Sequence, residues 1–389
     1  MYNRNSIFYI IIQKYLKIIY KYFAFIKYKQ NIKRLKKRIG PINSFTKVTL
    51  IQNNSVALIE PNPFHAETLP GYIKYFTDLG FNVDVFISIE NAYEKPFILM
   101  PQKFRIFIGE GNNIQKWMSY KNMKDYSHIF FSSLIYNKTL MFMPSLLPKE
   151  CKNIMGIEHN KEMYNQWLKG NVIYRIMKEN GKIAALSPNI GYQLINPHYF
   201  GNIKVNNKHS DKIIFVAVGS VSRLNSNNFL INSIRKLKQS DENRFEVHII
   251  GSGELDIPID LQSIIIHCGR LDFPSMYKEL ENSDFILAML NPNIQNHLKY
   301  LNGTTSGTVQ LSLGFKKPLI INSKFAKAYS FNNNEAIIYE DDGLSYAMKY
   351  SIDILPQKYV LLQQNIYQKS QTYYKKSIES IKRMILNTH

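Results

Sequence analysis

The sequence predicts an α/β protein built from two doubly wound, Rossmann-like halves, and three observations predict it. Short apolar segments typical of buried strands alternate with helical segments along most of the chain. This alternation starts twice, near residue 46 and near residue 212, and a polar stretch over 196–210 separates the two runs. At 389 residues the chain is also long for one hydrophobic core. We therefore expect two domains and a linker.

The first half begins with a β-loop-α-β unit, the usual start of a parallel sheet. A strand is expected at 48–51 or at 56–59, then a loop that contains His65 and Glu67, and then a helix over 72–79. Further strands are expected over 81–87, 104–108, 128–131, 153–157 and 182–186.

The second half repeats the pattern with clearer turns. Strands are expected over 212–218, 245–250, 263–267, 284–289 and 319–321, and helices over 227–237, 274–280, 309–315 and, with a break at Pro356, 345–386. Glycine-containing loops follow four of these strands, at 219–223, 251–254, 269–271 and 303–307. Ligands of such sheets bind at the carboxyl ends of the strands, so these loops are expected to converge on one rim.

The loop 303–307 has the composition of an anion site. Thr304, Thr305 and Ser306 offer hydroxyl groups, and Gly307 allows a ligand to approach the backbone closely. The helix that follows directs its first free N–H groups and its positive dipole end at the loop, an arrangement that commonly binds diphosphate. An ordinary N-capped helix after a glycine turn is the alternative.

The charge of the chain predicts an anionic partner. The formal net charge is +20, and no Asp or Glu precedes Glu60. Residues 6–26 are mostly apolar with a stripe of lysines at helical spacing, and the basic run 31–38 follows. This pattern is typical of a helix that lies on an anionic membrane surface. The same helix packed on the protein's own core is the alternative, and nucleic acid is a weaker one.

Three central lysines in that helix, Lys14, Lys17 and Lys21, make a true membrane span costly. No small-residue cleavage site follows the helix, which argues against a secretory signal.

The two cysteines, Cys151 and Cys268, are far apart and are expected to be buried reduced thiols. A zinc site is not expected, because neither cysteine has a close cysteine partner in the sequence and His267 is a single neighbouring histidine.

The second half resembles the nucleotide-sugar domain of GT-B glycosyltransferases, the broad group that includes families one and four. The matching segments are 215–220 with Arg223, 249–254, 268–271, 280–287 and 306–320. The resemblance implies a membrane-associating arm over 1–45, an acceptor domain over 46–200, a linker over 201–211, a nucleotide-sugar domain over 212–350, and C-terminal helices over 351–389 that could cross back to the first domain.

The resemblance also implies site residues. Donor-binding residues would be Gly219, Ser220, Arg223, Gly251, Gly253, Glu254, Leu271, Lys299, Thr305, Ser306 and Gly307. The catalytic base or acceptor-orienting group would be His65, Glu67 or His159. Plainer roles stay open: packing for the two histidines, a favourable first-turn charge for Glu67, and a solvated surface position for Arg223 or Glu254.

One departure from the family pattern concerns two carboxylates. Retaining family-four enzymes carry two glutamates eight residues apart around the loop and helix, whereas this chain has Gly303 and Leu311 near those positions. The Arg-plus-Lys pair that neutralises diphosphate is also incomplete, with Lys299 as a possible substitute for the lysine. The choice between retaining and inverting transfer therefore stays open.

The function implied is transfer of a sugar from a nucleoside-diphosphate-sugar to a hydroxyl of a lipid-linked surface glycan, such as a bacterial lipopolysaccharide or capsule. The chain would work in the cytoplasm, peripheral on the inner face of the membrane. No cofactor or metal is expected, because there is no Asp-x-Asp motif and the adjacent Asp341 and Asp342 suit a surface turn. The alternatives are a non-catalytic relative that binds a sugar nucleotide or partner enzyme, and a sugar-nucleotide epimerase.

Overall fold

The computed structural model describes residues 26, 29–30, 32–34, 51–63, 65–109, 121–134, 136–137, 141–142, 153–160, 171–205, 212–221 and 229–386. Almost all of the predicted basic arm, together with Arg223 and Cys151, lies outside the described residues. Among the helices of the described part, none is both long and apolar enough to cross a membrane.

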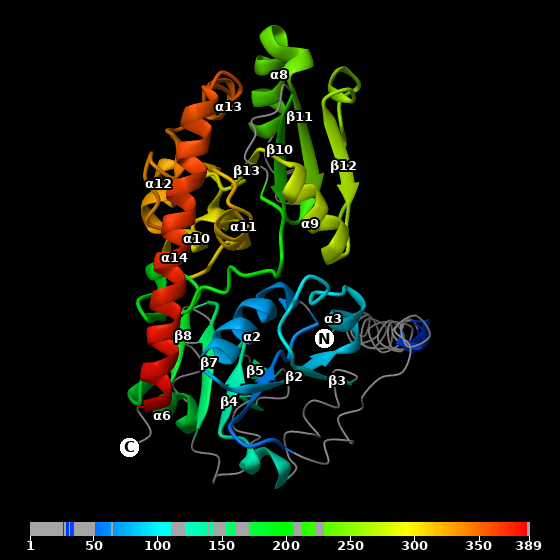
Figure 1. The fold of residues 1–389 in the computed structure, drawn as a ribbon. Helices are drawn as coiled ribbons and strands as arrows, with labels where there is room; N and C mark the ends of the chain where they lie inside the picture. The colour runs from blue at the N-terminus through cyan, green and yellow to red at the C-terminus, as the bar shows by residue number, and fades with distance from the viewer. Residues whose placement is uncertain are drawn as a thin grey trace, which may run out of the picture.

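The N-terminal domain is a parallel sheet of seven strands in the order β3-β2-β1-β4-β7-β8-β9 (Figure 1). The strands are β1 (Ser55–Ile59), β2 (Asn82–Ser88), β3 (Arg105–Gly109), β4 (His128–Phe131), β7 (Ile154–Glu158), β8 (Ile183–Ala185) and β9 (Gln193–Leu194). Its helices are η2 (Ala66–Thr68), α2 (Leu69–Asp78), α3 (Ile89–Tyr93), η3 (Lys121–Asp125), α6 (Val172–Glu179) and η5 (Pro188–Ile190), and a small hairpin joins β5 (Tyr136–Asn137) to β6 (Met141–Phe142).

The C-terminal domain is a parallel sheet of six strands in the order β12-β11-β10-β13-β14-β15. The strands are β10 (Ile213–Val218), β11 (Phe245–Ile250), β12 (Ile265–Gly269), β13 (Phe285–Leu287), β14 (Leu319–Asn322) and β15 (Ala336–Tyr339). The helices are α8 (Phe229–Asp241), η6 (Glu242–Arg244), η7 (Ile259–Leu261), α9 (Phe273–Asn282), η8 (Gln295–His297), α10 (Lys299–Asn302), α11 (Gly307–Phe315), α12 (Ser323–Ala328) and α13 (Leu344–Ile352).

Helix α2 begins earlier than the sequence predicts, at Leu69 instead of Tyr72. The prediction took Pro70 and Gly71 as a turn, but proline is well tolerated in the first helical turn, where its missing N–H group costs nothing. Gly71 is helical because it packs against another segment: a Cβ atom there would lie 2.6 Å from Cα of Pro197. The close approach of a distant segment, and not a turn, accounts for this glycine.

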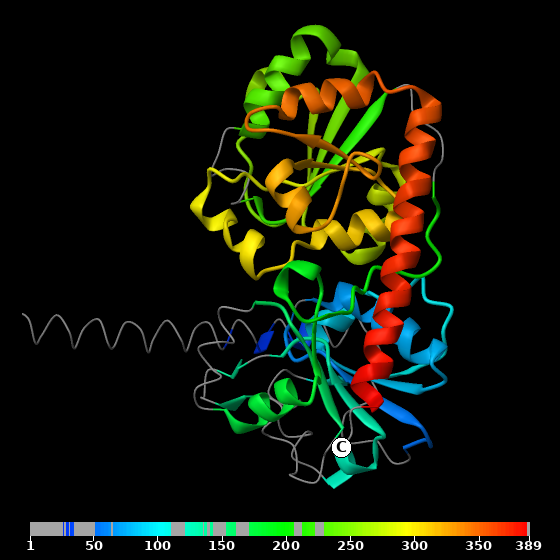
Figure 2. The ribbon, with the colours of Figure 1, turned by 90° about the vertical axis from the view of Figure 1, so that its left-hand side faces the viewer.

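Helix α14 (Pro356–Leu386) joins the two domains (Figure 2). It leaves the C-terminal domain, where Gln363 donates to the carbonyl of Lys316 at 3.3 Å, and runs along the N-terminal domain. There the Ser377 hydroxyl accepts from the Asn196 N–H at 3.0 Å, and the Tyr374 hydroxyl donates to Asp78 at 2.7 Å. The helix therefore restricts how the two sheets can move relative to each other.

Candidate active site

Loops at the carboxyl ends of strands from the two domains touch directly. Asn160, after β7, forms an isolated antiparallel bridge with Thr304, which precedes α11. The hydroxyls of Ser187, after β8, and Thr305 lie 3.0 Å apart. Because ligands of such sheets bind at these ends, the two contacts mark the boundary at which the ligand-binding edges of the two domains meet.

The N-terminal side of this boundary holds the three predicted catalytic side chains. Nδ1 of His65 lies 3.4 Å from Oε1 of Glu67, and the rings of His65 and His159 are 4.9 Å apart between centroids. His65 has a left-handed backbone, with φ 72°, which is unfavourable for a residue with a side chain. Its carbonyl accepts from both the N–H and the hydroxyl of Thr68, so local hydrogen bonds hold the turn in place.

A fourth ionisable side chain, Glu60, lies beneath this cluster and was not singled out in the sequence. It directly follows β1, is fully buried, and accepts hydrogen bonds from the hydroxyls of Ser132 and Ser133 at 2.8 and 2.9 Å. Ser133 Oγ is also 3.2 Å from Nε2 of His159. Burial raises the pKa of Glu60 to about 6, although the charge of His65 opposes the rise. The sequence feature that could have identified Glu60 is its position as an acidic residue directly after a predicted strand.

The pKa shifts of the three predicted residues differ, and the differences separate their roles. Burial lowers the pKa of His65, but the hydrogen bond and charge of Glu67 outweigh it and raise the pKa above 6.5. Burial raises the pKa of Glu67, but its hydrogen bond with His65 brings the net pKa below 4.5. Burial lowers the pKa of His159 to about 4, so this ring is neutral at pH 7. Glu67 is therefore ionised and His65 is the more basic imidazole.

His159 is oriented by the backbone. Its Nε2 lies 2.8 Å from the carbonyl oxygen of Ser132, which can only accept, so this nitrogen carries the proton and donates. A neutral ring held in this way suits packing against His65 better than accepting a proton at Nε2.

The C-terminal side of the boundary holds a small pocket whose lining combines glycine and hydroxyl-bearing residues with apolar side chains. Gly219, Ser220, Ser306 and Thr308 line it, together with apolar residues of β10 and of the segment after β13. The loops beneath it are tightly packed, since a Cβ atom on Gly251 would lie 1.6 Å from the carbonyl oxygen of Gly219. Any side chain at Gly251 would displace the Gly219 loop.

The N-terminus of α11 forms one wall of the pocket. Ser306 is the N-cap residue, and its hydroxyl lies 2.8 Å from that of Thr308. The N–H of Ser306 donates to the hydroxyl of the buried Tyr329 at 3.2 Å. Gly307 is exposed, and a Cβ atom built on it meets nothing within 4 Å. The fold therefore does not require a glycine at 307, whereas a ligand that approaches the helix end would.

Comparison of the sequence with models of known protein families gives no match, and a search of curated proteins also finds none. Solved structures do match. AviGT4, a glycosyltransferase involved in avilamycin A biosynthesis, aligns with a TM-score of 0.51 and 11% identity over 85% of this chain and 98% of that chain. T4 phage BGT in complex with UDP-glucose aligns with a TM-score of 0.49 and 11% identity over 85% and 99%. TarM aligns with a TM-score of 0.43 and 10% identity over 78% of this chain, which spans only 55% of TarM.

The chain has the GT-B fold. The predicted fold class, two facing Rossmann-like domains, is confirmed by the two parallel sheets and by the alignment with AviGT4 over nearly its whole length.

The other residues that the GT-B resemblance proposed for donor binding are placed less centrally. Gly253 and Glu254 are exposed in the loop after β11, and Leu271 is half-buried before α9. Lys299 is exposed on α10, with Nζ 5.3 Å from the ring centroid of Tyr300. Thr305 is turned toward Ser187 of the other domain, while Thr308, absent from the prediction, lines the pocket.

The GT-B positions that lack carboxylates are part of the packed interior. Gly303 is buried at the end of α10, and Leu311 is 5% exposed within the main hydrophobic core. The neighbouring Gln310 is equally buried, and neither atom of its side-chain amide has a hydrogen-bond partner among the described residues. Leu311 has a packing role, and Gln310 is a polar group on α11 that the sequence did not single out.

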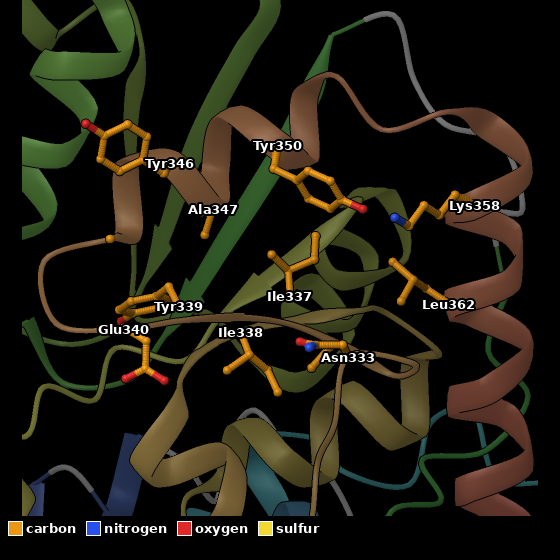
Figure 3. A pocket seen from close by; sticks show the side chains of 12 residues that line it. Asn333, Ile337, Ile338, Tyr339, Glu340, Tyr346, Ala347, Tyr350, Lys358 and Leu362 are labelled. Atoms are coloured by element: carbon orange, nitrogen blue, oxygen red, sulfur yellow. The ribbon is translucent and has the colours of Figure 1, made fainter.

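A larger pocket lies in the C-terminal domain beside the edge strand β15, away from the pocket at α11 (Figure 3). Tyr346 and Tyr350 on α13 and Lys358 and Leu362 on α14 surround it. Only two of its lining residues, Glu340 and Lys358, carry charge, and none of the predicted site residues reaches it. The chemistry of the lining, and not the size of the pocket, therefore identifies the candidate active site.

Proposed function

We propose that this protein is a glycosyltransferase that moves a sugar from a nucleoside-diphosphate-sugar to a hydroxyl of an acceptor. One observation carries the proposal. An imidazole–carboxylate pair, His65 and Glu67, belongs to the domain edge that meets the loop before α11 through Asn160–Thr304 and Ser187–Thr305. A proton acceptor on one side and an anion-binding helix end on the other are the two functions that sugar transfer needs.

The proposed step is a single displacement. The acceptor oxygen attacks the anomeric carbon of the donor sugar, and its proton passes to Nε2 of His65. Nδ1 of the same ring faces Glu67, whose negative charge stabilises the imidazolium that forms. The bond between the anomeric carbon and the diphosphate oxygen breaks, and its electron pair leaves with the diphosphate. Attack opposite the leaving group inverts the anomeric configuration.

The leaving diphosphate would be stabilised by groups that are already in place. Early N–H groups of α11, the dipole of that helix and the loop at Gly219 and Ser220 surround the pocket. Stabilisation that requires no rearrangement during the reaction is an effective form of catalysis. These groups support a metal-independent transfer, so we expect activity to survive treatment with a chelator.

The enzyme assay uses the purified full chain with UDP- and GDP-sugars, each with and without a lipid-linked glycan acceptor. We expect one donor to bind and to be consumed, and NMR of the product to show an inverted anomeric centre. Absence of binding and turnover with every donor would contradict the enzymatic proposal. Retention of configuration would contradict the role of His65 as base while leaving sugar transfer intact.

We further propose a lipid-linked surface glycan as the acceptor and a peripheral position on the inner membrane face. The support is the net charge of +20 and the basic, mostly apolar stretch within residues 1–40. Flotation with anionic vesicles tests this part separately. The full chain should float, and a chain lacking residues 1–40 should not, whereas equal flotation of both would contradict it.

A further inference from the structure

Three potential metal ligands of different chemistry meet on the C-terminal domain, away from the proposed active site. His248 lies on β11, Cys268 on β12 and Glu279 on α9, and one ligand atom from each lies within 4.8 Å of the other two. Nδ1 of His248 is 2.8 Å from a carboxylate oxygen of Glu279. All three side chains are half-buried, and Cys268 is a free thiol.

Strand pairing brings the histidine and the cysteine together. His248 lies opposite Ile266 on β12, and the register then shifts, so that Ile249 pairs with His267 and Ile250 pairs with Gly269. Cys268 falls at this irregularity, and its Sγ lies within 4.8 Å of the ligand atoms of His248 and Glu279. A zinc site was not expected from the sequence, because neither cysteine has a close cysteine partner and His267 is a single neighbour; the contact with His248 depends on strand pairing.

The surroundings of His248 match a second feature of metal sites. A histidine that binds a metal through one nitrogen usually donates its other N–H to a carboxylate, which fixes the ring and strengthens the ligand. Nε2 of His248 lies 3.2 Å from Oε2 of Glu246, and the other oxygen of Glu246 is held by Lys212 at 2.5 Å.

We propose that Nδ1 of His248, Sγ of Cys268 and the carboxylate of Glu279 bind one zinc-type divalent ion. Nitrogen, thiolate and carboxylate ligands suit Zn²⁺ and Co²⁺, whereas Mg²⁺ and Ca²⁺ prefer oxygen ligands alone. Ligand bonds of about 2 Å in a tetrahedron place neighbouring nitrogen and oxygen atoms about 3.3 Å apart. Binding therefore requires Glu279 to withdraw slightly from His248 and Sγ of Cys268, which lies within 4.8 Å of both ligand atoms, to reach about 3.5 Å from them, with a water molecule as the fourth ligand.

The position of this site predicts what the ion does. It would join β11, β12 and α9, immediately beside the loop that follows Cys268. In that loop the carbonyl of Gly269 accepts from the N–H of Gly251, and Arg270 pairs with Glu94 of the N-terminal domain. A bound ion would therefore hold the loop that contacts both the donor-side glycines and the opposite domain. This role does not depend on the proposed sugar transfer.

Binding is measured on the full chain without a histidine tag, after treatment with a chelator. Zn²⁺ is titrated in competition with a chromophoric chelator, and Co²⁺ binding is followed by absorption. We expect one ion per chain and a thiolate-to-cobalt charge-transfer band in the near ultraviolet. Affinity should fall as the pH is lowered, because the metal displaces the thiol proton into solvent. A wild-type chain that binds neither ion, or binds Co²⁺ without the thiolate band, would overturn the proposal.

Variants assign the ligands. Cys268→Ser should abolish the thiolate band. Glu246→Gln removes the carboxylate that faces Nε2 of His248 and should lower the affinity for Zn²⁺ by about 10–100-fold. His248→Gln removes a ligand and should lower this affinity at least as much. The matched controls are Cys151→Ser and His267→Gln, which should bind as the wild type does. Equal binding by Cys268→Ser and the wild type, or loss of binding in the controls, would overturn the assignment. Circular dichroism of each variant separates lost ligands from lost folding.

Discussion

The two domain edges that face each other differ in chemistry, although both lie at the carboxyl ends of the strands of a parallel sheet. The N-terminal edge presents ionisable side chains, with Glu60, His65, Glu67 and His159 joined through hydrogen bonds and ring contact. The C-terminal edge presents glycines, hydroxyls and the N-terminus of α11. In the proposed reaction the first edge would accept a proton and the second would bind an anion. The difference indicates that the proposed reaction is divided between the domains, with neither half sufficient alone.

The largest expected effect comes from removing the proton acceptor. His65→Ala should lower kcat by about 10²–10⁴-fold, the usual contribution of a general base, while donor binding changes little. Steady-state kinetics and titration with the donor measure the two quantities. The control is His267→Gln. His267 lies on β12 in the other domain, and its substitution should leave kcat unchanged. A His65→Ala enzyme with normal kcat would end the assignment of acid–base chemistry to the N-terminal edge.

On the C-terminal edge, Gly307→Ala should weaken donor binding by about tenfold, or 1.4 kcal/mol, because the new methyl group occupies the space in front of α11. Thermal unfolding should change little or shift upward, since alanine favours a helix by about 1 kcal/mol over glycine. Gly314→Ala on the same helix is the contrast, because its Cβ would lie 2.3 Å from the ring of Phe200 and should lower stability. If Gly307→Ala bound the donor normally, the anion would bind elsewhere.

The pH dependence separates the members of the N-terminal cluster. A base must be unprotonated to act, so kcat/KM should rise with pH through the pKa of His65, which Glu67 raises above 6.5. The Glu67→Gln variant loses the negative charge that raises the pKa of His65, while the burial that lowers this pKa remains. The rising limb of kcat/KM against pH should therefore move to lower pH. Profiles of kcat/KM against pH for both proteins test this. A limb that stays in place would mean that Glu67 does not act on His65.

The smallest effect should come from the contact between the edges. Thr305→Val removes a hydroxyl that lies 3.0 Å from that of Ser187, and a single neutral hydrogen bond contributes about 1 kcal/mol. We expect a drop of that size in the free energy of unfolding and a small rise in KM for the donor. Ser220→Ala, at a hydroxyl of the pocket wall, should instead raise KM without a comparable loss of stability. Identical behaviour of both variants would remove the distinction between boundary and pocket.

Much of the architecture could be predicted from the sequence, because alternating apolar strands and helical segments are visible locally. The sheets, the break between them and the glycine loops after strands follow from that pattern, and His65 and Glu67 were found because they lie in one such loop. Local patterns could not show that Thr305 faces Ser187 while Thr308 lines the pocket. Neither α12 nor β15 was among the elements predicted from the sequence.

By itself, then, the sequence determined the order of most strands and helices, the number of halves and the kind of residue at many strand ends. Only the tertiary structure decided which side chains share a site. It placed Glu60 beneath His159, paired His248 with Cys268 and not with His267, and made Leu311 part of the core. The physical reason is that periodicity depends on near neighbours, whereas a site depends on strand register and domain packing between segments far apart in the chain.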